Sequence, residues 1–180
     1  MQTSSEKRQP RFEHKDSTTK AKLIEIEREY SVPVRELWQA FTNPEALKQW
    51  WWPNGIHAEH VELEATEGGR YFISMNGYDG AGPVGGMTGR FEEVVENERL
   101  VMTDQFADKR GKAITPDQAQ MPGGWSDMAY ITFEFESDGS NGSRFKLSQQ
   151  GIPNEYQKDC IQGWSESFDK LESYLSKRSH

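Results

Sequence analysis

The chain has 180 residues, of which 34% are hydrophobic and 12% aromatic, and it carries a formal net charge of −8. This length and aromatic content fit one globular domain with a real core and exclude a chain that is disordered throughout. Residues 1–20 carry five basic and three acidic side chains, which leaves a net charge of −10 on the remaining residues. Such an acidic body repels phosphate and excludes general nucleic-acid binding.

The single cysteine, Cys160, excludes a disulfide framework and a cysteine zinc site within one chain, and it fits a reducing compartment. The first 20 residues lack the apolar run of a signal peptide. No apolar segment approaches the roughly 18 residues that a membrane helix needs. We therefore expect a cytoplasmic protein without membrane insertion or a nucleic-acid partner. We expect a monomer or a homodimer, with no cofactor.

The chain begins with a polar segment, followed by a strand. Residues 1–20 show no apolar period, and we expect them to form a disordered tail before a single domain over residues 21–178. Residues 22–31 then alternate apolar and charged side chains, a pattern that predicts a strand with one buried face. Arg28 lies on the apolar face of this strand, so its guanidinium should point inward and requires a partner.

Two short helices are predicted after this strand. Pro33 suits the first helical position, and an apolar stripe with helical spacing continues to about Thr42. Pro44 starts a second helix, which ends in three consecutive tryptophans at residues 50–52. Three large aromatic side chains in a row cannot all point into one core. Some of them must therefore line a surface, a groove or a cavity.

Six further segments predict strands, because apolar and polar residues alternate between turn signals. These segments are residues 57–66, 70–75, 87–95, 99–106, 128–136 and 144–149. Two longer connections separate some of them, a glycine-rich one over residues 76–86 and a second one over residues 107–127. A connection as long as the second is uncommon unless it is functional or mobile.

The last element is a long amphipathic helix that Pro153 opens. Its apolar side chains recur three or four residues apart over about 24 residues, and Gly163 near the middle indicates close packing or a pocket wall. A curved antiparallel sheet wrapped around this C-terminal helix would bury every apolar stripe. We therefore predict an α+β fold with a sheet of about six to seven strands and two short helices after the first strand.

Five segments in this order resemble the START-like superfamily, also called the SRPBCC, polyketide-cyclase or birch-allergen (helix-grip) fold. Within it, the chain is similar to the branch named after the activator of heat-shock protein 90 ATPase. The segments are Arg28 with Val32-Pro33 and the helix carrying Trp38, TNPEALKQWW at 42–51, GGRY at 68–71, Gly89-Arg90-Phe91 with Arg99-Leu100, and GWSESFDKLESYL at 163–175. Trp52 departs from this pattern, since the family often has glycine there.

The resemblance implies a cavity between the long helix and the sheet, in which family members bind hydrophobic or amphipathic small molecules. Apolar walls with a few polar groups are typical of such sites. The residues expected to form the body of the cavity are Trp50, Trp51, Tyr71, Ile73, Met75, Phe133, Trp164 and Phe168. Arg28 and Asp104 are the expected polar anchors, and Arg90 is also among the residues expected to bind the ligand.

Arg28 has two interpretations. Its guanidinium forms either a structural ion pair near a strand end or an anchor for a ligand carboxylate or carbonyl. Glu64, Arg90 and Asp104 are its candidate neighbours.

Other reactive residue types have less promising surroundings. His57 and His60 lie three apart on a predicted strand and face opposite sides, which disfavours a shared metal ion. Cys160 lies on the apolar stripe of the last helix, and we expect inert packing. The run GAGPVGG over residues 80–86 lacks the lysine and the following helix of a phosphate loop. We expect it to form a mobile loop at the cavity entrance.

Three functions are compatible with these patterns. The first is binding of an apolar, aromatic or lipid-like small molecule, with no established catalysis. The second is an enzyme of the cyclase or hydrolase type, for which Asp104 with Arg28 or Tyr71 supplies the acid–base set. The third is a protein-interaction module, such as a chaperone accessory. It predicts an exposed apolar patch around Trp51, Trp52 and Trp125.

Overall fold

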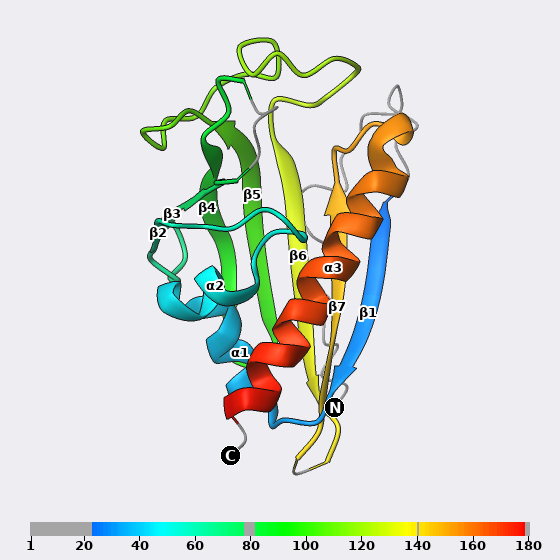
Figure 1. The fold of residues 1–180 in the computed structure, drawn as a ribbon. Helices are drawn as coiled ribbons and strands as arrows, with labels where there is room; N and C mark the ends of the chain where they lie inside the picture. The colour runs from blue at the N-terminus through cyan, green and yellow to red at the C-terminus, as the bar shows by residue number, and fades with distance from the viewer. Residues whose placement is uncertain (1–22, 78–81, 140, 179–180) are drawn as a thin grey trace, which may run out of the picture.

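The structure is a computed structural model that describes residues 23–77, 82–139 and 141–178. The predicted tail over residues 1–20 lies outside the described residues, as do Gly80 and Ala81 at the start of the predicted loop. The described residues form a curved antiparallel sheet, with one long helix across a face and two short helices beside it (Figure 1). This arrangement confirms the predicted α+β architecture.

The seven strands within the described ranges form one sheet in the order β1-β7-β6-β5-β4-β3-β2. Their bounds are β1 (Ile24–Tyr30), β2 (Val61–Leu63), β3 (Arg70–Ser74), β4 (Gly86–Val95), β5 (Arg99–Ala107), β6 (Ala129–Ser137) and β7 (Ser143–Gln150). From β2 to β7, each strand pairs antiparallel with the next one along the chain. The first strand pairs with the last, which places β1 at the edge beside β7.

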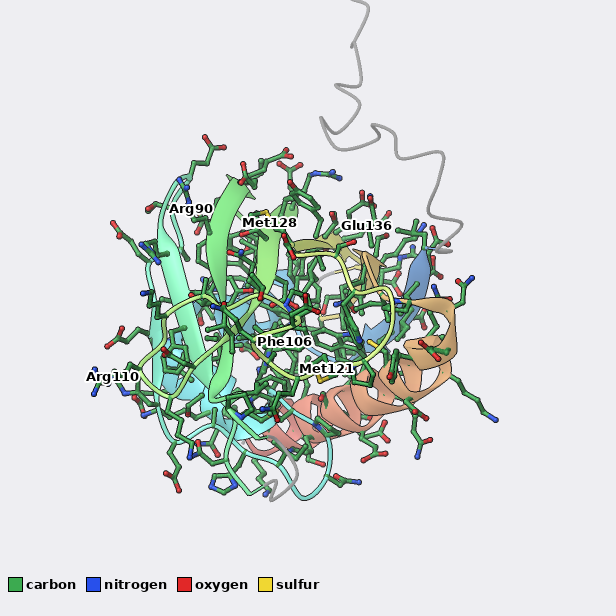
Figure 2. The ribbon with its side chains drawn as sticks, turned by 90° about the horizontal axis from the view of Figure 1, so that it is seen from above. Arg90, Phe106, Arg110, Met121, Met128 and Glu136 are labelled. Carbon is green, nitrogen blue, oxygen red and sulfur yellow. The ribbon has the colours of Figure 1, made fainter. Side chains whose placement is uncertain are left out.

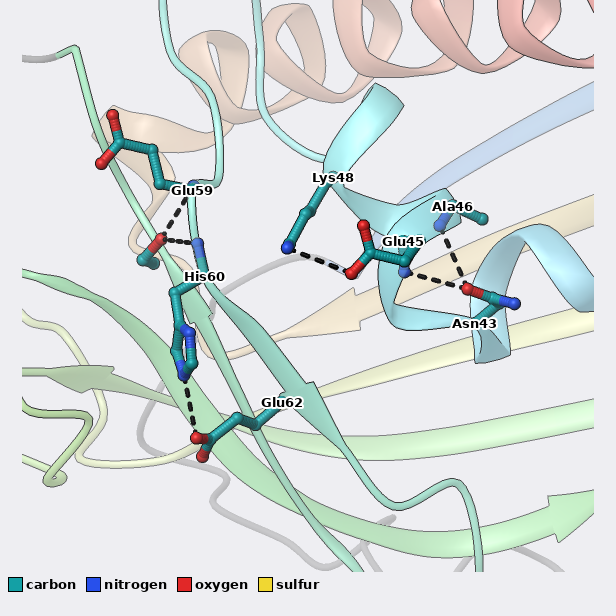
Figure 3. Close-up of polar contacts among 8 residues, drawn as sticks. Asn43, Glu45, Ala46, Lys48, Glu59, His60 and Glu62 are labelled. Carbon is teal, nitrogen blue, oxygen red and sulfur yellow. Dashed lines mark hydrogen bonds and ion pairs between the residues drawn. The ribbon is translucent and has the colours of Figure 1, made fainter.

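The three helices in the described part are α1 (Val34–Thr42), α2 (Pro44–Trp50) and α3 (Asn154–Arg178). Asn43 separates the first two. Its side-chain oxygen accepts hydrogen bonds from the backbone N–H groups of Glu45 and Ala46 at 2.9 and 3.3 Å (Figure 3). This cap satisfies donors that the first helical turn leaves unpaired. The sharp turn between the helices lets α2 pack against α3.

A solid aromatic core fills the space between α1, α2 and the sheet. The ring of Phe41 lies at its centre, with centroid distances of 4.7 Å to both Trp50 and Phe133. The rings of Phe135 and Phe145 lie 5.0 and 5.4 Å from it. All five side chains are buried, and their edge-to-face and tilted contacts add to the free energy gained from burial. This end of the sheet is therefore closely packed.

The apolar face of α3 lies against the sheet. Phe168, Leu171 and Leu175 on that face are buried, and the hydroxyl of Tyr30 in β1 donates to the carbonyl of Phe168 at 3.1 Å. This contact connects the helix to the edge strand. None of the helices within the described ranges combines the length and the apolar composition that a membrane span requires.

The second strand is shorter than the predicted segment over residues 57–66, because only Val61–Leu63 pair continuously with β3. Before β2, the backbone pairing is interrupted between the isolated bridge of His57 with Asn76 and the start of the strand, and a side chain provides part of the hydrogen bonding there. The hydroxyl oxygen of Ser74 accepts hydrogen bonds from the backbone N–H groups of Glu59 and His60 at 3.1 and 2.9 Å (Figure 3). Such side-chain bonds compete with strand pairing, and the alternation of the sequence does not reveal them.

Candidate functional site

A cavity of about 290 Å³ lies between α3 and the sheet, at the end where β5 stops and β6 begins. Its walls come from the segment after α2, the end of β5, the end of β7, the first half of α3 and residues 125–127. Seen from above, the long connection before β6 crosses this end of the molecule, between Arg110 on one side and Met121 on the other (Figure 2). The long connection therefore contributes to the site.

Indole side chains form much of the wall, and they belong to Trp51, Trp52, Trp125 and Trp164. The rings of Trp51 and Trp164 meet edge to face with their centroids 5.2 Å apart. Trp125 packs against Phe106 of β5 at 5.4 Å and against Tyr156 of α3 at 5.0 Å. These two contacts hold the end of the long connection between the sheet and the helix.

Trp52 adopts an unusual backbone conformation, with φ of 104°. A positive φ is costly for a residue with a large side chain, and glycine adopts it most readily. The indole N–H of Trp52 donates to the backbone carbonyl of Ser74 at 2.7 Å, which fixes the ring against β3. This conformation explains why glycine, which is common at this position in the family that the chain resembles, suits the position. In this chain the residue is Trp52, and its side chain forms part of the cavity wall.

The buried ionisable acid of the cavity is the carboxyl of Asp104 on β5, which is 8% exposed. Burial raises the pKa of Asp104 to about 7, and the hydrogen bond with Tyr71 offsets part of that rise. Burial, together with the charge of Asp104, raises the pKa of Tyr71 well above its ordinary value. The phenol therefore stays protonated while the carboxyl titrates near neutral pH.

The tyrosine hydroxyl lies 2.7 Å from the carbonyl oxygen of Thr103 and 2.8 Å from Oδ1 of Asp104. A phenol has only one proton to donate. Both contacts are satisfied when Asp104 is neutral, because the carboxyl then donates to the Tyr71 oxygen while Tyr71 donates to Thr103. The geometry thus agrees with the raised pKa of Asp104.

A second polar group, the amide of Gln149 on β7, faces the helix side of the cavity. Its Oε1 accepts a hydrogen bond from the indole N–H of Trp164 at 2.8 Å and one from the thiol of Cys160 at 3.5 Å. Burial, and then the charge of Asp104, raises the pKa of Cys160 to about 12. The thiol is therefore protonated at neutral pH, which argues against a nucleophilic role.

The structure divides the predicted cavity residues into two groups. Trp51, Met75, Asp104 and Trp164 line the cavity. The other apolar members do not line it, because their side chains are buried in the packed core or behind the wall: Trp50, Tyr71, Ile73, Phe133 and Phe168.

The two predicted arginines lie away from the cavity. Arg28 is half-buried on β1, and its guanidinium donates to the backbone carbonyl of Glu27 at 3.2 Å. No ion pair within the described residues involves Arg28. Pairing with Asp104 is excluded because the sheet order places two strands between β1 and β5. Arg90 is exposed on β4, at the outer side of the sheet (Figure 2).

The exposed apolar patch expected of a protein-interaction module does not form at the predicted indoles. Trp51 is buried, and Trp52 and Trp125 are half-buried in the cavity wall. The large hydrophobic residues exposed in the described part lie in separate segments of the chain and are Leu23, Val95, Met128 and Ile161.

The histidines of this region form separate surface contacts. His57 lies 3.3 Å from a carboxylate oxygen of Glu59. His60 lies 2.8 Å from a carboxylate oxygen of Glu62, as Figure 3 shows. Within the described ranges, no three His, Cys, Asp or Glu side chains form a group that could hold a metal ion.

Several residues of the cavity wall were not predicted from the sequence, namely Ile56, Phe106, Gln149, Ile152 and Asp159. One of them carried a signal. Gln149 shares a strand face with Phe145 and Leu147, and a polar residue on a buried face marks a site with a polar partner. Ile56 and Ile152 lie in loops and Phe106 lies near the end of β5, where periodicity carries little information, whereas Asp159 is an exposed residue within α3.

Comparisons with known proteins place this geometry in a family. The chain resembles the crystal structure of a protein from Chromobacterium violaceum, with 25% identity over 84% of this chain and 96% of that chain, at a TM-score of 0.66. It also resembles the crystal structure of the AHSA1 protein from Silicibacter pomeroyi, with 21% identity over 87% and 99% of the two chains, at a TM-score of 0.68. An Arthrobacter aurescens protein shares 22% identity over 90% of both chains, also at 0.68.

These solved structures share the fold, and their names state no ligand. No curated protein matches the sequence. Residues 31–176, which include both short helices, the strands β2 to β7 and most of α3, match one family of sequences. The chain therefore belongs to the family described as activator of Hsp90 ATPase homolog 1-like proteins.

Proposed function

We propose that this protein binds a small hydrophobic or aromatic molecule in the cavity between α3 and the sheet. The observation that carries the proposal is a cavity of about 290 Å³ walled by four indoles around one buried carboxyl. Apolar walls with few polar groups are typical of small-molecule sites. A cavity of about 150 Å³ suffices for benzene in another protein, so this one has room for a two-ring aromatic molecule.

A direct test is calorimetric titration with 1-naphthalenemethanol, a neutral two-ring probe. We expect saturable binding with a dissociation constant in the micromolar range. A leucine at Gly163 should block it, because this glycine lines the cavity in the middle of α3. Its added Cβ would meet only Pro53, at 3.7 Å, so the first side-chain carbon fits, and urea unfolding of the variant checks that the protein still folds.

The matched control is a leucine at Gln162, the neighbouring residue, whose side chain is exposed on the same helix. G163L should weaken binding at least tenfold, whereas Q162L should leave it within twofold. The proposal fails if the unchanged protein shows no saturable binding, or if the two variants bind equally well.

One observation favours a second function, acid–base catalysis on a hydrophobic substrate. A buried carboxyl with a pKa of about 7 that faces a cavity is suited to proton transfer at neutral pH. Hydrolysis of 1-naphthyl acetate tests this function. A rate that titrates near pH 7 and disappears in Asp104→Asn would support it, and an unchanged rate in that variant would contradict it.

A further inference from the structure

The charged side chains on the cavity wall all have the same sign. Asp104 lies inside, and Asp127 and Asp159 are exposed at the mouth. Within the described part of the chain, the lining contains no Lys, Arg or His. Three carboxyl groups without a basic group create a potential that attracts cations and repels anions. The charge distribution therefore distinguishes ligands of equal shape and different charge.

Lys170 of α3 approaches the wall from its outer side. Its ammonium donates to the backbone carbonyls of Pro53 and Ile56 at 3.4 and 3.3 Å, two residues whose other atoms line the cavity. Burial lowers the pKa of Lys170, and the charge of Glu166 offsets part of that change. Lys170 is not part of the lining, and no ion pair in the described ranges involves Asp104.

The indoles reinforce this preference. An anion in the cavity would need free N–H donors, but three of the four lining indoles, those of Trp52, Trp125 and Trp164, already donate their N–H groups to oxygen atoms of the protein. The faces of the rings have the opposite property, because the π electrons of tryptophan attract a cation placed over them. The aromatic wall and the carboxyl groups thus favour the same class of ligand.

We propose that the cavity selects hydrophobic cations, such as arylalkylamines, over neutral and anionic molecules of the same shape. This inference rests on the proposed binding function and adds the charge of the ligand to it. The aromatic part of the ligand packs among the indoles, and its ammonium group pairs with the carboxylate of Asp104.

Proton linkage follows from this pairing. Because the pKa of Asp104 is about 7 in the free protein, a bound cation favours the charged carboxylate and lowers that pKa. Binding an amine at or below pH 7 therefore releases a proton, and affinity increases with pH until the carboxyl is ionised in the free protein. Tyr71 of β3 and Cys160 of α3 also face Asp104, and both stay protonated in this range. The other ionisable side chains that line the cavity are Asp127 and Asp159 at its mouth.

The test compares three probes of matched shape by calorimetry at pH 8, namely 1-naphthylmethylamine, 1-naphthalenemethanol and 1-naphthoate. We expect the amine to bind at least tenfold more tightly than the alcohol, and the carboxylate to bind most weakly. Equal affinities of the amine and the alcohol would overturn the inference and leave the proposed function intact. If none of the three binds, the proposed function itself fails.

The variant Asp104→Asn tests whether the preference for the amine depends on Asp104. The amide keeps the size of the carboxyl but cannot become charged, so the ratio of the alcohol and amine dissociation constants should fall towards one. In the unchanged protein the amine should bind several-fold more weakly at pH 6 than at pH 8, and this dependence should disappear in the variant. A preference that persists in Asp104→Asn would overturn the role of Asp104.

Asp127→Asn with Asp159→Asn provides a second measurement that does not depend on the buried site. Both side chains are exposed, so the double variant should fold normally. It should reduce the amine preference only a few-fold, and the reduction should be smaller at high salt because exposed charges are screened. A double variant that abolishes the preference would place selection at the mouth and overturn the assignment to the cavity interior.

Discussion

The two ends of the face that α3 covers are built from similar residues and have opposite properties. At the α1 end, the rings around Phe41 approach within 4.7–5.4 Å and leave a solid core. At the other end, four indoles surround a cavity. The difference lies in the backbone, because a helix pair inserts side chains into the first end, whereas loops and strand ends enclose the second. Aromatic content alone therefore does not predict where a protein is hollow.

Trp51 marks the boundary between the two ends. Its ring lies 5.3 Å from that of Trp50 on the packed side and 5.2 Å from that of Trp164 on the cavity side. Changes in the packed end should therefore affect stability, and changes in the hollow end should affect binding. The following predictions test this division.

The largest effect should come from Phe41→Ala at the centre of the packed end. Removing a fully buried phenylalanine typically costs about 3–5 kcal/mol, because the surrounding rings cannot close the space. The matched change at the hollow end, Trp125→Ala, should cost much less in urea unfolding but weaken binding of 1-naphthalenemethanol. Equal losses of stability in the two variants would show that both ends are packed alike.

The next effect concerns pH. The pKa of Asp104 is about 7 in the folded protein and 3.8 for a free carboxyl, so the folded state holds the proton more tightly. The contribution of this group to the free energy of unfolding is fully present below pH 3.8 and is lost as pH rises to about 7. Relative to Asp104→Asn, the unchanged protein should lose on the order of a few kcal/mol across this range.

Urea unfolding of the two proteins at pH 5 and pH 8 measures this loss, and other titrating groups cancel in the comparison. A difference in stability between the two proteins that does not change with pH would contradict the raised pKa.

A smaller effect should appear at Trp52, where φ is 104°. In most positions glycine is less stable than alanine by roughly 0.5–1 kcal/mol, because it has more freedom to lose. At a positive φ the order reverses, since a Cβ is strained there. Trp52→Gly should therefore be more stable than Trp52→Ala by about 1 kcal/mol. Thermal unfolding compares the stabilities of the two variants. A higher stability of the alanine variant would contradict the proposed backbone strain at position 52.

The smallest effect should come from Gly163→Ala in α3. The new methyl group would meet Pro53 at 3.7 Å, an ordinary contact, and alanine gains up to about 1 kcal/mol of helix propensity over glycine. We expect slightly higher stability. Gly89→Ala is the contrasting change, because its Cβ would lie 2.0 Å from the backbone oxygen of Thr103 in β5. It should destabilise strongly in the same unfolding assay.

The periodic parts of the chain were predictable from the sequence. Alternation and helical spacing located the helices and the strands, although the strand predicted over residues 57–66 proved much shorter, and five short segments indicated the family and the fold. These signals are local, because a buried face repeats every two or 3.6 residues. For the same reason, the sequence pattern predicts that Gln149 lies on a buried strand face, but it does not predict the hydrogen-bond partners of Gln149.

Only the tertiary structure decided which tryptophans line the cavity and which polar residues meet there. The backbone turns after α2, so Trp50 enters the core, Trp51 lies at the boundary and Trp52 forms a wall. Arg28 and Asp104 had compatible strand faces, but the order of the strands keeps them apart. A cavity is the volume left over when distant segments pack, and no local pattern encodes a sum of side-chain volumes.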